Sequence, residues 1–326
     1  MLSCHMTRSC HNDFGGNHRY LKAMLLTPTT LAYGRSRTCR ERTRFGIIDI
    51  TFVNMGEALD RGLEGFLPGV HRYPYKGKDD FPNVMNYELT LPDRREFFLV
   101  TNLSQHTFEA DFFNTEDKPF SHSWKEYFYD SQLLVVEMLP RVPHERASRR
   151  LSQFIMSVAD ANAQLSPDNL IIPDGTAAVQ LGTSAKCPDE SFRPLYFAHQ
   201  AFPTVIVETA FTESPQKLEQ DARRWVTQSN GQVTVITVHL EESTERIVLQ
   251  RWVLANGSPV RRQETTITNV RGARRNEGAS VQITNAPFII PYQELLARAP
   301  RSSNDRDISI DVMALGLLCE QVWASQ

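Results

Sequence analysis

Long apolar runs are absent from this 326-residue sequence, in which the longest, such as residues 133–136, have the length of a strand. A membrane-spanning helix needs about 20 consecutive apolar residues, so no transmembrane segment is expected. Cysteine is scarce: the five cysteines form no Cys-x-x-Cys pair and are odd in number, which argues against a disulfide framework and a structural zinc site. We expect a soluble protein of a reducing, intracellular compartment, the cytoplasm or the nucleus.

Strong charge of one sign is also missing. Lys and Arg number 35 and Asp and Glu number 38, so the net charge is −3 and no global field draws the chain to nucleic acid or anionic lipid. The hydrophobic share of 41% and the charged share of 22% are typical of a globular protein with a real core. Single cores stop growing at about 250–300 residues, so one large domain or two modest ones are expected.

The first 44 residues differ in charge from the rest. They carry eight basic and two acidic side chains, an excess of six positive charges, which leaves an excess of nine negative charges on residues 45–326. A basic leader is typical of a mitochondrial transit peptide, but this one lacks a clean amphipathic stripe. Cys4, His5, Cys10 and His11 fit no known metal-finger spacing. We expect a flexible tail, with ordered structure beginning near Phe45.

The pattern divides the chain into four parts. Residues 1–44 are the basic segment, 45–125 an extension of short strands and long loops, 126–256 an α/β core, and 257–326 an Arg-rich loop with a C-terminal helix. Within the extension, alternating apolar residues at 96–102 and 106–113 favour strands. No internal repeat is visible.

The core begins with a strand and a helix. Residues 131–138 are a β-rich apolar run ended by prolines. The apolar residues within 147–158 recur at helical spacing, and projecting their stripe back one turn places His144 on it. Two short strands are expected next, at 169–172 and 176–181, joined as a hairpin by a Pro-Asp-Gly turn.

A strand, a helix and a strand follow. The run 204–208 is too apolar to have a solvent-exposed face, which favours a central buried strand. Ser214 is placed as an N-cap with Pro215 at the first helical position, and the next strand spans 233–240. The short connections between this strand, helix and strand predict a right-handed βαβ unit in one sheet.

The last part contains weaker patterns. They predict an antiparallel strand at 245–254, a polar, Arg-rich loop at 260–278, a short element at 289–296 and a final helix at 311–324.

Two acids stand beside strands of the core. Asp189 lies in the loop after the second expected strand, and Glu208 ends the third. Carboxylates that leave adjacent strand ends can converge on one hard divalent cation such as Mg²⁺. Such an ion generates the nucleophile and neutralises developing charge in phosphodiester hydrolysis.

The order helix, strand, strand, strand, helix, strand, together with three short motifs, resembles the PD-(D/E)XK (restriction-endonuclease-like) superfamily. Within it the chain is similar to a bacterial family assigned as restriction endonucleases and to uncharacterised fungal proteins. The motifs are Val135-Val136-Glu137 followed by Pro143-His144, Pro188-Asp189, and Thr204-Val205-Ile206-Val207-Glu208 followed by Thr212-Glu213-Ser214. The resemblance implies a Mg²⁺- or Mn²⁺-dependent nuclease in which Asp189 and Glu208 bind the metal.

The chain departs from the signature at one position. The superfamily has a lysine two residues after the glutamate, where this chain has Ala210. In the bacterial family that lysine has moved onto the following helix, where this chain has Asp221, with Lys217 one turn earlier on the same flank. Lys217 is therefore our candidate for the cation that positions the attacking water, while the aspartate is equally compatible with lost activity.

Each candidate has a structural alternative. Asp189 after a proline is often only a turn former. A carboxylate such as Glu208 at the end of an apolar central strand must be paired, metal-bound or at the sheet edge. His144 is often a helix-start residue bonded to a loop, although the resemblance makes it a catalytic candidate. The remaining residues are interpreted structurally: Glu137 and Glu145 as solvated, Trp225 as core.

Local positive charge supplies most nonspecific affinity for nucleic acid. Two clusters qualify as contacts: Arg141, Arg146, Arg149 and Arg150 flank the first core helix, and Arg261, Arg262, Arg271, Arg274 and Arg275 lie in the later loop. Arginine runs are also usual on solvated faces.

Two functions therefore stand side by side. The first is a Mg²⁺-dependent nuclease with Asp189, Glu208, Lys217 and His144 at its site. The second is a non-catalytic binding or scaffold protein on a decayed nuclease-like core, favoured by the missing lysine and the acidic balance. Another hydrolase type has little support, because no Gly-x-Ser-x-Gly, P-loop or dinucleotide fingerprint occurs. The oligomeric state is not fixed by the sequence.

Overall fold

A central, mostly antiparallel sheet organises the second half of the chain. In the computed structural model, the described residues are 37–43 and 46–52 (as backbone strands), 70–92, 96–116, 120, 123–138, 141–165, 167–197, 201–211, 214–270 and 281–324. These residues form a mixed α/β protein with six α-helices and three β-sheets. Among them, no helix is both long and apolar enough to cross a membrane.

The central sheet has seven strands in the order β15-β14-β13-β12-β11-β10-β7. Their bounds are β7 (Ile171–Pro173), β10 (Glu190–Pro194), β11 (Val205–Ala210), β12 (Thr234–Glu241), β13 (Arg246–Ala255), β14 (Ser258–Asn269) and β15 (Val281–Thr284). β11 and β12 are parallel and are joined through α4 (Pro215–Gln228), whereas the other neighbours are antiparallel. The expected βαβ unit and antiparallel following strand are confirmed.

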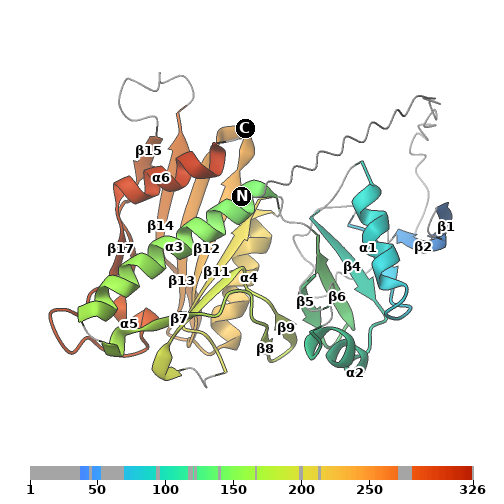
Figure 1. Ribbon diagram of the computed structural model, residues 1–326, viewed down its shortest axis with the longest axis horizontal. Coiled ribbons are helices and arrows are strands. Elements are labelled where there is room, and N and C mark those ends of the chain that lie inside the picture. Colours follow the sequence, from blue (N-terminus) through green and yellow to red (C-terminus); the bar gives the residue numbers. More distant parts are fainter. Residues whose placement is uncertain are drawn as a thin grey trace, which may run out of the picture. The chain divides into compact units, whose positions relative to one another are not determined.

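Helices cover both faces of this sheet. α3 (Val142–Leu165) and α6 (Val312–Trp323) lie along one face, and α4 packs on the other (Figure 1). The alternation along β11 follows this division: Val205 and Val207 belong to the core under α3 and α6, and Ile206 to the core under α4. All six residues of β11 are buried, as its apolar run predicted.

The sequence specifies α4 closely. The Ser214 hydroxyl accepts a hydrogen bond from the Lys217 amide, and Pro215 occupies the first turn. Trp225 is fully buried on the apolar stripe, and the chain leaves the helix through Asn230 and Gly231, which both have positive φ. The expected helix and its starting residues are therefore confirmed.

A second sheet, called here the N-terminal sheet, has eight strands in the order β1-β2-β3-β4-β6-β5-β9-β8. Their bounds are β1 (Arg37–Thr43), β2 (Gly46–Phe52), β3 (Arg72–Pro74), β4 (Phe97–Thr101), β5 (Trp124–Phe128), β6 (Leu133–Glu137), β8 (Val179–Leu181) and β9 (Ser184–Lys186). Strands from both sides of residue 125 share this sheet, and the expected domain division at that residue stays a prediction.

An aromatic core packs on the N-terminal sheet. It includes residues of α1 (Phe81–Thr90), α2 (Gln105–Phe108) and a π-helix (Glu109–Phe113). Phe108 stacks on Tyr127 with ring centroids 4.0 Å apart. The strand expected at 106–113 is therefore wrong: the Phe-rich spacing there buries one face of a helix instead.

Three further expectations differ from the structure. The hairpin at 169–181 is wrong, because β7 pairs with β10 while β8 pairs with β9 in the other sheet. A loop was expected at 260–278, but residues 258–269 form β14, in which Ser258, Arg261 and Arg262 are exposed. The element at 289–296 is split. It comprises most of β16 (Phe288–Ile290) and α5 (Tyr292–Leu295), and β16 pairs with β17 (Ile308–Ile310).

The remaining helices of the described residues are single 3-10 turns at Pro167–Asn169, Leu195–Phe197 and Glu242–Thr244. Most of the basic segment, including Cys4, His5, Cys10 and His11, lies outside the described residues, as do Arg271, Arg274 and Arg275.

Candidate active site

Asp189 and Glu208 are brought together by antiparallel pairing. Glu190 lies opposite Val207 where β10 meets β11, so Asp189, which immediately precedes β10, is next to Glu208. The Asp189 amide donates a hydrogen bond to the Val207 carbonyl at 3.2 Å. The sequence placed Asp189 in a loop that leads directly to Glu208. The intervening β10, which was not expected, sets their proximity.

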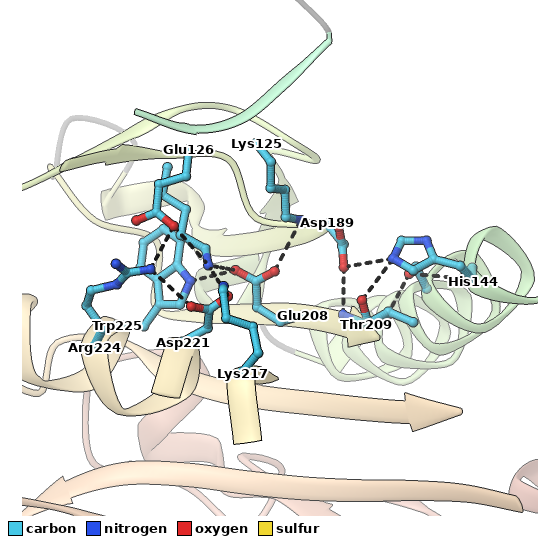
Figure 2. A network of polar contacts seen from close by, with 12 residues as sticks. Lys125, Glu126, His144, Asp189, Glu208, Thr209, Lys217, Asp221, Arg224 and Trp225 are labelled. Atoms are coloured by element: carbon cyan, nitrogen blue, oxygen red, sulfur yellow. Dashed lines mark hydrogen bonds and ion pairs between the residues drawn. The ribbon is translucent and has the colours of Figure 1, made fainter. Parts of the chain in front are cut away.

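Lys125 of β5 contacts both acids, although the sequence patterns did not indicate it as a site residue. Its ammonium binds the Asp189 carboxylate and lies 3.2 Å from Glu208 Oε2 (Figure 2). The strand register slips here, with Trp124 opposite Val136 but Glu126 opposite Val135, so Lys125 is the extra residue of a β-bulge. A bulge re-aims a side chain out of the regular alternation.

Lys125 and Asp189 each stabilise the charged form of the other. Burial acts against the charged form of Lys125, but Asp189 and then Glu208 outweigh it and raise the pKa of the ammonium well above its usual value. Burial likewise opposes ionisation of Asp189, but Lys125 and His144 hold the pKa of that carboxyl well below its usual range. Both groups are charged at neutral pH.

His144 lies in the first turn of α3 and is 4% exposed. Its Nε2 is 2.9 Å from the Thr209 carbonyl oxygen and 3.4 Å from Asp189 Oδ2. Its Nδ1 is buried and has no hydrogen-bond partner among the described residues. Burial favours the neutral ring, but Asp189, Glu137 and Glu96 raise the pKa of His144 to about 9.

Lys217 belongs to a separate cluster on the other side of Glu208. Its ammonium lies 2.6 Å from Asp221 Oδ2, which the Lys186 ammonium contacts at the same distance. We call the following set the closed group: Glu126, Lys186, Lys217, Asp221 and Arg224. Arg224 bridges Asp221 and Glu126 at 3.0 and 2.7 Å.

Glu208 joins the closed group to Lys125. Its Oε1 accepts a hydrogen bond from the Trp225 indole at 2.6 Å and lies 3.5 Å from the Lys186 ammonium. Its Oε2 faces Lys125 (Figure 2). Trp225 is thus core, as expected, and it also orients this carboxylate. The three lysines around the acids come from β5, β9 and α4, so their convergence depends on tertiary structure.

A cavity of about 440 Å³ borders Lys125 and Asp189. Its charged lining residues are one base and three acids: Lys125, Glu137, Asp174 and Asp189. We call Lys125, Glu137, His144 and Asp189 the open group, because three of its four members line this cavity. The closed group contributes no residue to the lining.

Glu137 is partly buried, contrary to the expectation of a solvated side chain. Burial, opposed by Lys125 and reinforced by Asp189, raises the pKa of this carboxyl to about 7. Glu145 instead forms a surface ion pair with Arg149 at 2.9 Å, as expected of a solvated residue.

The arginines proposed to contact nucleic acid have varied surroundings. Arg149 is exposed, Arg146 donates to the Gln321 carbonyl at 3.4 Å, and the Arg150 guanidinium lies 4.3 Å from the centre of the Phe154 ring. Arg274 and Arg275 lie outside the described residues. Nucleic-acid contact by these side chains stays a prediction.

Two sets of residues could hold a metal ion. Asp189 and Glu208 are the oxygen donors expected from the sequence, and Glu96, Glu137 and His144 form a second set whose ligand atoms lie within 4.8 Å of one another.

No protein-family model and no curated protein matches the sequence. Among solved structures, the chain is similar to a crystal structure from Anabaena variabilis described as "a putative nuclease belonging to DUF820". The alignment covers 63% of this chain and 94% of that chain, with 10% sequence identity and a TM-score of 0.35.

Proposed function

We propose that the chain is a metal-dependent nuclease of the PD-(D/E)XK type, which hydrolyses phosphodiester bonds in nucleic acid. The observation that carries this proposal is the position of Lys125, whose ammonium contacts both Asp189 and Glu208 at the edge of a cavity. Two acids and a lysine are the residue types of the superfamily site. In this chain Lys125 takes the part of the lysine missing at position 210, in place of Lys217.

The order of elements around the central sheet supports the same assignment. With β8 and β9 set aside, because they join the N-terminal sheet, the order is α3, β7, β10, β11, α4, β12. This is the helix, strand, strand, strand, helix, strand order of the superfamily core. Asp189 precedes the second of these strands and Glu208 lies in the third.

The donor set fits a hard divalent ion. Asp189 and Glu208 converge on one cation position, which the Lys125 ammonium now takes, and Mg²⁺ is commonly held by one or two carboxylates plus substrate phosphate. Lys125 borders the cavity, so its flexible side chain has room to turn aside. When bound, Mg²⁺ or Mn²⁺ supplies Lewis-acid stabilisation of the phosphoryl oxygens and lowers the pKa of the attacking water.

The residues of the chain then have distinct tasks. Asp189 and Glu208 hold the ion, and Lys125 orients the attacking water and offsets negative charge that develops on the phosphoryl group. His144 is a positioning residue: its Nε2 contacts Asp189 Oδ2, and the Thr209 amide donates to the same oxygen at 2.6 Å. The amide hydrogen bond and the adjacent imidazole thus fix the direction of the carboxylate.

The charge of the cavity supports a metal requirement. Carboxylates outnumber ammonium groups in its lining, although Arg193 pairs with Asp174, so a divalent cation favours the approach of an anionic phosphodiester. Binding of nucleic acid at this cavity is therefore expected to depend on the ion.

The test is cleavage of plasmid DNA, single-stranded DNA and RNA with Mg²⁺ or Mn²⁺, with EDTA as the blank. Asp189→Asn and Glu208→Gln should each abolish cleavage, whereas the matched change Glu219→Gln, in an exposed surface ion pair, should retain it. Cleavage that survives in both site variants would overturn the proposal.

A non-catalytic protein on a nuclease-like core is the second candidate, and one observation favours it. Each carboxylate oxygen of both acids already faces a donor of the protein: Lys125, the Thr209 amide, and the Trp225 indole. Calorimetry with Mn²⁺ separates the two functions. An active site shows a binding component that Glu208→Gln removes, and a decayed core lacks that component.

A further inference from the structure

We propose that Glu96, Glu137 and His144 form a second divalent-cation site, distinct from the acids of the proposed nuclease site. Each of the three offers one ligand atom, and these atoms lie within 4.8 Å of one another. Glu96 and His144 are buried and Glu137 is partly buried. Two carboxylates and an imidazole at this spacing can surround one ion.

The hydrogen bonding of His144 points to a ligand. Its Nε2 lies 2.9 Å from a backbone carbonyl oxygen, which only accepts, so Nε2 carries the proton. In the neutral ring that metal ligation requires, the other nitrogen, Nδ1, is then the acceptor, and it is buried with no partner among the described residues. Metal-binding histidines show this pattern, in which the second ring nitrogen donates to a carbonyl or carboxylate and fixes the tautomer.

Backbone pairing fixes the two glutamates. Glu96 immediately precedes β4 and Glu137 ends β6, where Phe97 lies opposite Glu137. The Met138 amide also donates to the Glu96 carbonyl at 2.7 Å. The α3 helix adds His144 from its first turn. An ion at this point therefore links the N-terminal sheet to α3, and through His144 it supports Asp189.

The site has an entry path and a charge that attracts a cation. Glu137 lines the 440 Å³ cavity, so an ion that enters the cavity reaches one of its ligands. Metal ligation needs an imidazole nitrogen that carries no proton and makes no other bond, and Nδ1 of His144 lies unpartnered beside the two carboxylates.

The ligand types select a class of metal. Carboxylates suit Mg²⁺, Ca²⁺ and Mn²⁺, and an imidazole shifts preference toward transition metals such as Mn²⁺ and Zn²⁺. We therefore expect a transition dication here, held more tightly than Mg²⁺. Mn²⁺ is the better probe of the two, because the thiols of Cys4 and Cys10 in the same chain favour Zn²⁺.

The experiment is calorimetric titration of the full chain with Mn²⁺, in the wild type and in three variants. If the proposed nuclease site also binds, the wild type takes up two ions. Glu208→Gln should retain the ion at the second site, and Glu96→Gln with Glu137→Gln should lose it, with a drop in affinity of at least about 10–100-fold. The control Glu219→Gln with Glu242→Gln removes two surface carboxylates and should change nothing.

Pulsed electron paramagnetic resonance on the Mn²⁺ complex of Glu208→Gln gives an independent readout that requires no further variant. A nitrogen coupling from an imidazole ligand supports the site, and its absence overturns it. Loss of all Mn²⁺ binding in Glu208→Gln also overturns it. Failure of the proposed nuclease activity looks different, because Mn²⁺ then still binds with an imidazole ligand while no nucleic acid is cleaved.

Discussion

The closed group and the open group are two buried charge clusters on either side of Glu208, and they differ in access and in pairing (Figure 2). In the closed group, Asp221 is shared by Lys186, Lys217 and Arg224, and none of these residues borders the cavity. In the open group, Lys125, Glu137 and Asp189 line the cavity, and His144 keeps a nitrogen without a partner among the described residues.

This difference separates two uses of buried charge. A charge removed from water is costly unless a partner compensates it, so a fully paired cluster fixes the position of its elements. A cluster that borders a cavity and retains an unused donor or acceptor can bind a ligand. The pKa values are perturbed in both groups, so perturbation alone does not identify the functional one.

The largest expected effect is a loss of protein stability when the closed group is disrupted. Asp221→Asn leaves Lys186 and Lys217 buried, and Arg224 partly buried, around one neutral amide. Breaking a buried pair by removing one partner costs on the order of 3–5 kcal/mol, and we expect a loss of this size in the free energy of unfolding. Urea denaturation followed by circular dichroism measures it.

The matched control is Glu219→Gln on the same helix, where Glu219 and Arg223 form an exposed i,i+4 pair at 2.7 Å. Exposed pairs contribute about 0.2–1 kcal/mol, so this change should be small. Equal losses in the two variants would contradict the structural role of the closed group.

The next effect concerns which lysine serves the proposed reaction. Lys125→Met removes the cation that contacts both acids, and Lys217→Met removes one from the closed group. Loss of one electrostatic donor at a reacting site typically costs about 10²–10³-fold in rate. We expect Lys125→Met to lose this factor in the turnover of DNA, and Lys217→Met to retain turnover once corrected for the fraction folded.

The opposite ranking, with Lys217→Met inactive and Lys125→Met active, would restore the lysine assigned from the sequence. Both variants keep Asp189 and Glu208, so Mn²⁺ binding measured in parallel separates loss of the ion from loss of the water-orienting group.

Sequence patterns predicted those helices and strands that are determined by residues close together in the chain. The Ser214 cap and the Pro215 start define α4, and the same holds for α6, where the Asp311 carboxylate accepts from the Ala314 amide. The apolar run of β11 predicted its central position, because a strand buried on both faces has no polar alternation. These features depend on neighbours within a few residues.

What the sequence did not show depends on pairing between distant strands. Lys125 reaches the acids through a bulge in β5, and its only local signal is a Lys-Glu pair within an otherwise aromatic strand. β8 and β9 leave the core to join the N-terminal sheet, so a Pro-Asp-Gly turn that fits a hairpin connects strands of different sheets. Register and sheet membership are decided by tertiary packing, which short motifs do not encode.

A smaller effect is the response of the closed group to acid. Burial opposes ionisation of Asp221, but Lys186 first, then Lys217 and Arg224, hold its pKa well below the ordinary value of 3.8. A depressed pKa contributes stability that is present above that value and is lost as the pH falls below it. We expect up to about 1.4 kcal/mol per pH unit from this one proton below pH 4.

Urea midpoints between pH 5 and pH 3 measure this slope in the wild type and in Asp221→Asn. Asp189 is present in both proteins, so the difference between the two slopes isolates Asp221. Parallel slopes would mean that the Asp221 carboxylate is not held ionised by its partners.

The smallest effect compares access to two thiols. Burial raises the pKa of both Cys187 and Cys319 to about 12, so at pH 8 each thiol is protonated and intrinsically slow to alkylate. Cys187 lines the cavity beside the open group, whereas Cys319 is fully buried on the core-facing side of α6. With iodoacetamide, a small neutral reagent, we expect severalfold faster labelling of Cys187 in peptide mass maps of the native protein. Labelling of Cys319 at the same rate or faster would show that the cavity gives no access from solvent, and the distinction between an open and a closed group would then rest on pairing alone.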